Sequence, residues 1–179
     1  EERLRFQKRV SHMQVLEYMR DHVLLLDGGM GSLLQARGLK PGEHPERWNI
    51  THAETIVEVQ KAYFDAGSNV VNTNTFGANG LKLKRTGRGV EEIVTAAVQV
   101  AKKAAGTAAM VALDIGPLGK LLQPYGDLAF ENAVEIFAQT VKLGAKYGAD
   151  LVLIETMSDC YEAKAAMLAV KENSDLPVL

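Results

Sequence analysis

Hydrophobic residues gather in four short runs along this chain, and each run ends on a polar or acidic residue followed by glycine, threonine or proline. The runs are VLLLDGG at 23–29, VVNTNTFG at 70–77, MVALDIGP at 110–117 and LVLIET at 151–156. A continuous apolar run of this kind is typical of a buried parallel strand, whose carboxyl end opens into a loop that can carry function. We therefore expect functional residues at the run ends, which are Asp27, Asn74, Asp114 and Glu155.

Helical patterns lie between and after these runs, with apolar residues at spacings of three and four. They cover 54–66, 91–105, 130–147 and 159–172. An internal repeat supports the alternation, because GSNVVNTNT at 67–75 aligns with GADLVLIET at 148–156. Alternating strands and helices with right-handed crossovers leave two main architectures, an open doubly wound sheet or a (β/α)8 barrel.

The length and the last residues favour an incomplete barrel. A complete barrel needs about 250 residues, whereas this sequence has 179 and ends in LPVL, which resembles the start of another strand. We expect an α/β fold of the TIM (β/α)8-barrel type with about its first half present, namely four strands and the start of a fifth. Residues 1–179 are predicted to form a single domain, in which 1–22 is an amino-terminal helical extension.

Composition indicates an ordinary globular domain, with 47% hydrophobic residues, 23% charged residues and a formal net charge of −2. Nucleic acid is not expected as a partner, because 20 Lys and Arg do not exceed 22 Asp and Glu. No membrane partner is expected, since no apolar run approaches the roughly 20 residues that span a bilayer. The single cysteine excludes an intrachain disulfide and is compatible with a cytoplasmic location.

The segment around Asp27 carries the densest candidate chemistry. Gly28, Gly29 and Gly31 can adopt positive φ and let the backbone approach a ligand closely, and a helix that follows would present free N–H groups to a carboxylate. A tight turn after a strand explains the same glycines. In a parallel barrel Asp27 and Glu155 would share one face, where two carboxylates could hold a substrate ammonium. Capping of the next helix is the structural alternative for each of them.

Four further residues are weaker candidates. Thr73 and Thr75 follow a run, where threonine hydroxyls often bond local backbone. Asp114 lies in LDIGP and is a possible pocket wall. Trp48 lies in a loop-like stretch, where its ring could line a pocket or cover the mouth of the barrel.

Five sequence blocks carry a resemblance to a known family: LLLDGGMGSLLQARG, PERWNITHAE, AYFDAGSNVVNTNTFGAN, ALDIGPLGKLLQPYG and LIETMSDCYEAKAA. Together they resemble the amino-terminal half of the homocysteine S-methyltransferase family, and most of all the homocysteine-binding module of cobalamin-dependent methionine synthases. The resemblance implies a (β/α)8 barrel that binds homocysteine at the carboxyl ends of its strands. It also implies that Asp27, Gly28, Gly29 and Glu155 bind the amino-acid end of the ligand, with Thr73 and Thr75 in the same pocket.

The resemblance further implies methyl transfer to the homocysteine thiol, with zinc held by three cysteines and methylcobalamin as the expected donor in a full-length parent. The cysteines of the family lie in Gly-x-Asn-Cys and Gly-Gly-Cys-Cys segments, and neither occurs in this sequence. Cys160 matches neither segment. We therefore expect this chain to bind no metal or cofactor by itself and to be inactive alone.

Other functions stay open at this point. The chain could be a non-catalytic half-barrel that binds an amino acid or serves in oligomerisation, and exposed sheet edges could pair two copies as a homodimer. A different barrel enzyme could use Asp27 and Glu155 in acid/base chemistry. The methyl donor could be a corrinoid, betaine or S-methylmethionine.

Overall fold

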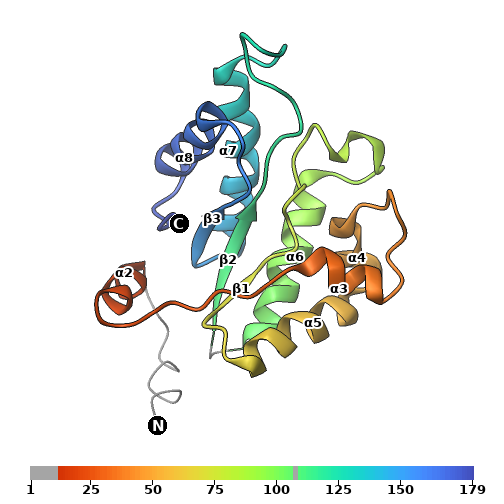
Figure 1. The fold of residues 1–179 in the computed structure, drawn as a ribbon, viewed down its shortest axis with the longest axis vertical. Helices are drawn as coiled ribbons and strands as arrows, with labels where there is room; N and C mark the ends of the chain where they lie inside the picture. The colour runs from red at the N-terminus through yellow and green to blue at the C-terminus, as the bar shows by residue number, and fades with distance from the viewer. Residues whose placement is uncertain (1–11, 107–108) are drawn as a thin grey trace.

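Three parallel strands form the centre of the computed structural model, which describes residues 12–106 and 109–179. They are β1 (Val70–Asn72), β2 (Met110–Ile115) and β3 (Leu151–Ile154), in the order β1-β2-β3 (Figure 1). Val70 pairs with Met110 and Ala112 pairs with Leu151, so the three carboxyl ends lie at the same edge. Three of the four predicted strands are therefore confirmed, within an α/β fold.

Helices alternate with these strands as the sequence predicts. The four expected helices are α5 (Ala53–Ala66), α6 (Val90–Ala105), α7 (Phe130–Tyr147) and α8 (Cys160–Asn173). Gly148 takes the left-handed conformation that ends α7, while the Asp159 side chain accepts a hydrogen bond from the backbone N–H of Tyr161 and begins α8. The shorter elements are α2 (His12–Asp21), α3 (Met30–Ala36), η1 (Pro45–Arg47), α4 (Trp48–Thr51) and η2 (Leu83–Arg85).

The first apolar run is not a strand, and this prediction was wrong. Residues 23–29 form an extended segment that joins α2 to α3 and runs beside β1 (Figure 1). Leu25 exchanges hydrogen bonds with Asn69, donating its N–H to the side-chain oxygen and accepting from the backbone N–H. No regular ladder follows, and the side chains of Val23 and Leu25 are 77% and 52% exposed. The single neighbouring strand, β1, does not bury the apolar side chains of this run.

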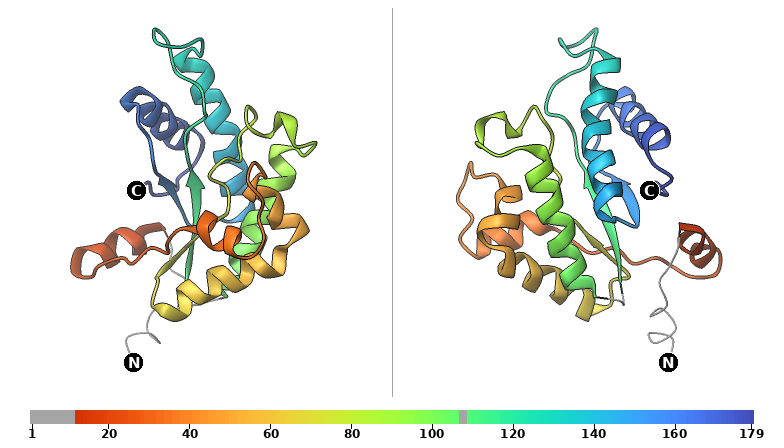
Figure 2. Two further views of the ribbon diagram at one scale, coloured as in Figure 1. Left: turned by 45° about the vertical axis from the view of Figure 1, so that its right-hand side comes forward. Right: turned by 180° about the vertical axis from the view of Figure 1, so that it is seen from behind.

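The two faces of the sheet pack against different partners, as the alternation of strand side chains requires. Val71 and Val111 pack against Ala101 and Ala105 of α6, and Figure 2 shows α6 and α7 in front of the strands when the molecule is seen from behind. On the opposite face, buried strand residues surround Val15 of α2. The predicted amino-terminal extension is thus helical over His12–Asp21, and residues 1–11 lie outside the described residues.

The final residues extend the sheet beyond β3. Val178 forms an isolated parallel bridge with Val152, and the N–H of Leu179 donates to the carbonyl of Val152 at 3.0 Å. This pairing agrees with the start of a further strand in LPVL. No described helix is long and apolar enough to cross a membrane.

Candidate functional site

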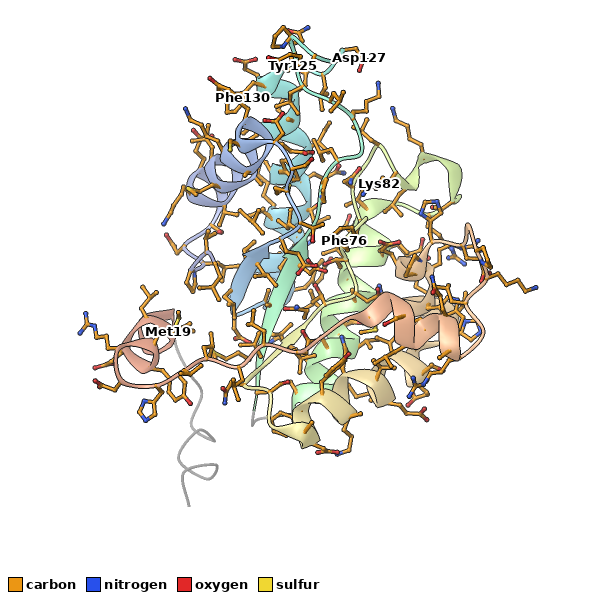
Figure 3. The ribbon with its side chains drawn as sticks, in the orientation of Figure 1. Met19, Phe76, Lys82, Tyr125, Asp127 and Phe130 are labelled. Carbon is orange, nitrogen blue, oxygen red and sulfur yellow. The ribbon has the colours of Figure 1, made fainter. Side chains whose placement is uncertain are left out.

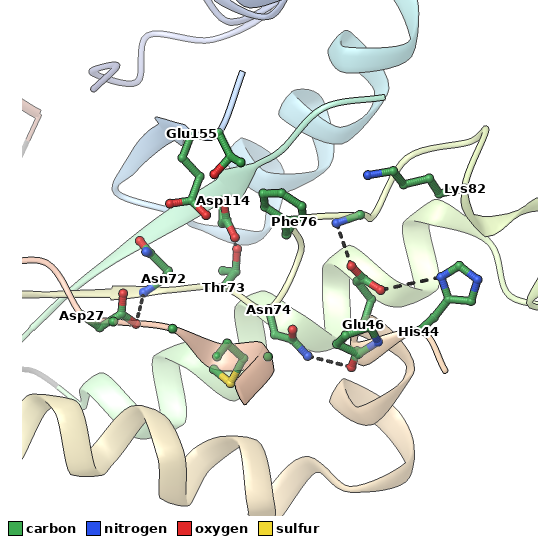
Figure 4. A pocket seen from close by; sticks show the side chains of 17 residues that line it. Asp27, His44, Glu46, Asn72, Thr73, Asn74, Phe76, Lys82, Asp114 and Glu155 are labelled. Carbon is green, nitrogen blue, oxygen red and sulfur yellow. Dashed lines mark hydrogen bonds and ion pairs between the residues drawn. The ribbon is translucent and has the colours of Figure 1, made fainter. Parts of the chain in front are cut away.

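A cavity of about 620 Å³ opens where the strands end (Figure 4). Its walls come from the segment before α3, the stretch around η1, and the loops that follow β1, β2 and β3. Four carboxylates and two side-chain amides contribute to its polar lining. The lining residues are Asp27, Gly28, Gly29, Met30, Gly31, His44, Pro45, Glu46, Asn72, Thr73, Asn74, Phe76, Gly77, Lys82, Asp114, Glu155 and Thr156.

Three carboxylates from distant parts of the sequence meet in this cavity. Asp27 comes from the extended segment, Asp114 from the end of β2 and Glu155 from the residue after β3. The backbone N–H of Asn72 donates to Oδ2 of Asp27 at 2.9 Å, which fixes the extended segment against β1. The structure therefore brings together the run ends that the sequence singles out.

Burial raises the pKa of two of these carboxyl groups. The pKa of Asp27 rises to about 6, mainly because burial disfavours the charged form, while the hydrogen bond from Asn72 opposes the rise. The pKa of Asp114 rises to about 8, again mainly through burial, with added repulsion from Glu155, Asp27 and Glu46. Within the described residues, Oδ1 of Asp27 and Oδ1 of Asp114 are buried without a hydrogen-bond partner. Acceptors of this kind suit a ligand that brings a positive charge and N–H donors.

Thr73 and Thr75 hold Asp114 in place through its backbone. The Thr73 hydroxyl accepts from the N–H of Asp114 at 3.0 Å, and the Thr75 hydroxyl donates to the carbonyl of Asp114 at 2.7 Å. The two hydroxyls are 2.6 Å apart. Thr73 lines the cavity, whereas Thr75 lies on a smaller neighbouring hollow. Both hydroxyls thus bond backbone, as their chemistry alone suggests.

The glycines after Asp27 line the cavity but lack the expected conformation. No positive φ occurs at Gly28, Gly29 or Gly31, so that part of the prediction was wrong. Gly28 is required for a different reason, since a Cβ there would lie 2.9 Å from the ring of Tyr63. The Tyr63 hydroxyl donates to the carbonyl of Gly29 at 3.2 Å. A close approach to α5, and not a turn with positive φ, explains the glycine.

Trp48 lies in the core and not on the cavity wall. It begins the short helix α4 instead of occupying a loop, and its side chain is buried with Leu34, Ile56 and Val59. Its ring stacks on His52 with the centroids 4.1 Å apart. The residue joins α4 to α3 and α5, which is a structural role.

Several lining residues had no signal in the sequence. Glu46 is only 4% exposed, and its Oε1 accepts from the N–H of Gly77 at 2.7 Å. Its other oxygen lies 4.0 Å from Nδ1 of His44. Phe76 packs so closely on Gly116 that a Cβ there would lie 2.5 Å from its ring. These placements depend on contacts between separate loops, which local spacing does not reveal.

Comparisons with known proteins match this chain to a family and to solved structures of similar fold. Residues 24–179 match the homocysteine S-methyltransferase family over most of the chain. The chain belongs to this family. The oxidised form of homocysteine methyltransferase MmuM from Escherichia coli is similar with a TM-score of 0.77 and 22% identity, over 89% of this chain and 62% of that chain. Its metallated form gives 0.78 and 21%, over 90% and 64%. The chain thus spans less than two thirds of these relatives.

The zinc site that the family resemblance implies does not fit the described residues. Cys160 is the single cysteine of the sequence, and it is exposed at the start of α8. Among the described residues, no group of three or more His, Cys, Asp or Glu is arranged to hold a metal ion. A homocysteine S-methyltransferase domain with these residues can bind and orient a polar ligand and exchange a proton with it. A thiolate cage for zinc needs side chains that this sequence lacks.

Proposed function

We propose that this chain is the homocysteine-binding part of a methyltransferase that forms methionine from homocysteine. The observation that carries the proposal is the convergence of Asp27, Asp114 and Glu155 in one cavity at the strand ends. An α-amino group carries a positive charge and three N–H donors, which complement this acidic end. Gly28 and Gly29 would contact the same amino-acid portion from the neighbouring wall.

Binding of an ammonium group would change the proton content of the site. Asp114, whose pKa is about 8, holds a proton at neutral pH in the free protein. A bound cation favours the ionised carboxylate and lowers its pKa, so a proton leaves as the ligand enters. Thr73 and Thr75 keep Asp114 oriented during this exchange through their backbone hydrogen bonds.

We further propose that methyl transfer itself needs residues that this chain lacks. Thiol activation in the family depends on cysteine-bound zinc, and Cys160 alone cannot form such a site. The 179-residue chain would then be inactive alone, as a single domain equivalent to the first half of a barrel. Methylcobalamin is the methyl donor that we propose for the parent protein, and the cytoplasm its location.

Calorimetry with L-homocysteine and L-methionine tests the binding proposal. We expect weak binding to the unmodified chain, and at least a tenfold loss of affinity in Glu155→Ala, since a charge-assisted hydrogen bond disappears. Glu135→Ala is the matched control, because Glu135 is exposed on α7 and does not line the cavity. Equal heats for the unmodified chain and Glu155→Ala would refute the assignment of the pocket.

The exposed apolar edge favours a second candidate, a homodimer in which the chain acts as a non-catalytic amino-acid-binding or oligomerisation module. Val23, Leu25 and Leu26 are 77%, 52% and 37% exposed beside β1. Uncovered strand-like edges promote pairing between chains. Sedimentation over a range of concentrations tests this, with Leu25→Lys expected to shift a dimer towards monomer. A monomer at all concentrations would exclude pairing through this edge.

A further inference from the structure

The charges around the cavity are divided between two ends. Asp27, Asp114 and Glu155 lie on one side of Phe76, and Lys82 lies on the other side with His44 and Glu46 (Figure 4). Among the described residues that line the cavity, Lys82 is the only lysine or arginine. A ligand that spans the cavity therefore meets acidic groups at one end and an ammonium at the other.

The fold fixes the position of Lys82 through its backbone. The side-chain oxygen of Asn79, which is 4% exposed, accepts the N–H groups of Leu81 and Lys82 at 3.0 Å each. This turn leads into η2 and places Lys82 beside Phe76 (Figure 3). The lysine thus starts from an ordered backbone, so that binding a ligand does not have to order the loop that carries it.

Glycines on two loops leave room for the stem of the lysine. A Cβ at Gly119, in the loop after β2, would lie 3.0 Å from Cε of Lys82. A Cβ at Gly77, in the loop after β1, would lie 3.4 Å from Cδ. The side chain therefore passes between the two loops, and Lys82 is one of the residues that line the cavity.

The ammonium of Lys82 is not neutralised by the acidic groups around it. Its Nζ lies 5.2 Å from the centroid of the Phe76 ring, and the ion pairs among the described residues do not include it. Glu46, the carboxylate on the same side of Phe76 in Figure 4, already accepts from Gly77 and faces His44. An ammonium beside an aromatic ring stays attractive to an anion.

We propose that Lys82 binds the carboxylate of the ligand that occupies this cavity. The inference rests on the proposed function and deepens it, because the acidic residues would hold an ammonium group while Lys82 holds a carboxylate on the other side of Phe76. Two sources could supply the carboxylate: the amino-acid acceptor itself, or a small methyl donor such as a betaine. In either case Lys82 selects carboxylate ligands over uncharged analogues of the same shape.

Paired ligands test this without any need for turnover. L-Methionine and L-methioninol share the side chain and the ammonium, and only methionine has a carboxylate. By calorimetry, we expect the unmodified chain to prefer methionine by about tenfold, the scale of one charge-assisted hydrogen bond. Lys82→Met should abolish this preference while it leaves methioninol affinity unchanged, which also shows that the acidic end is intact. Lys82→Arg should retain the preference.

Lys84→Met is the matched control, because Lys84 is exposed two residues away and does not line the cavity. A second titration, with glycine betaine in saturating methioninol, identifies the source of the carboxylate. If Lys82→Met weakens betaine binding and the methionine preference persists, Lys82 serves the donor. If neither measurement responds to Lys82→Met, the proposal is overturned. Absence of any methionine or methioninol binding to the unmodified chain would instead overturn the proposed function, and this inference with it.

Discussion

Two segments of this protein share one sequence pattern and have different surroundings. LLLD at 24–27 and VALD at 111–114 are both apolar runs that end on aspartate. The second lies in β2, which has a strand on each side, and all six residues of β2 are buried. The first lies beside β1 alone, makes no regular ladder and exposes Leu25 and Leu26.

The comparison shows that neighbours decide how such a run behaves. The apolar run at β2 forms a regular, buried strand because α6, α7 and two strands surround it. The same composition at the edge gives only an extended segment, held to β1 by Asn69 and Asn72. The chemistry follows the same difference, since the pKa of Asp114 rises to about 8 and that of Asp27 to about 6.

The largest effect should come from replacing these two carboxyl groups in turn. The raised pKa values mean that the folded protein keeps protons which the unfolded chain releases, so stability falls as pH rises from about 4 to 8 for Asp114 and to 6 for Asp27. Asp114→Asn should abolish the larger fall, on the order of 5 kcal/mol in unfolding free energy between pH 4 and 9. Asp27→Asn should abolish a fall in unfolding free energy about half as large, and this fall lies entirely below pH 7. Denaturant unfolding at a series of pH values measures both.

Asp127→Asn serves as the control for these variants. Asp127 is exposed, and the hydrogen bond from Lys120 lowers its pKa. Replacing this carboxyl group should therefore change the pH dependence of stability only slightly, and in the direction opposite to that of Asp114→Asn. Parallel pH profiles for the unmodified protein and Asp114→Asn would contradict the burial of this carboxyl group.

A second effect should separate the packing of the two runs. Leu113→Ala in β2 should lower the unfolding free energy by about 3 kcal/mol, because a fully buried leucine leaves a cavity. Leu25→Ala should cost less than about 1 kcal/mol, since half of that side chain already contacts solvent. Urea denaturation gives both values. Similar losses at the two positions would mean that another chain covers the edge in solution.

The sequence predicts the fold best where elements are surrounded. Periodicity alone locates α5, α6, α7 and α8 within two residues, because each has an apolar face that packs on the sheet or on a neighbouring helix. It fails at 23–29, where the expected strand depends on a neighbour that the described residues do not supply. The sequence of an apolar run does not predict which elements will pack against it.

The residues of the candidate site also differ in how well the sequence predicts them. Asp27, Asp114 and Glu155 are visible in the sequence because each ends a run, and parallel strands bring such ends together. Glu46 lies in the short 3₁₀ helix η1 and Lys82 in the turn before η2, where position depends on single contacts such as the one between Glu46 and Gly77. Local patterns do not encode contacts of that kind, so only the structure reveals them.

The smallest effect concerns the backbone that follows each acidic residue. Gly28 follows Asp27, whereas Glu155 is followed by Thr156, which has φ of 59° and is the only described residue other than glycine with positive φ. A β-branched residue is disfavoured there, so the surrounding strands must hold it. Thr156→Gly should therefore exceed Thr156→Ala in unfolding free energy by about 1 kcal/mol, because glycine alone relieves the left-handed conformation. Gly31→Ala in α3 should show the reverse preference, since alanine favours helices and a Cβ at Gly31 would meet nothing within 4 Å. An alanine variant of Thr156 as stable as the glycine variant would show that the backbone after β3 is unstrained. The segments that carry Asp27 and Glu155 would then differ in burial alone.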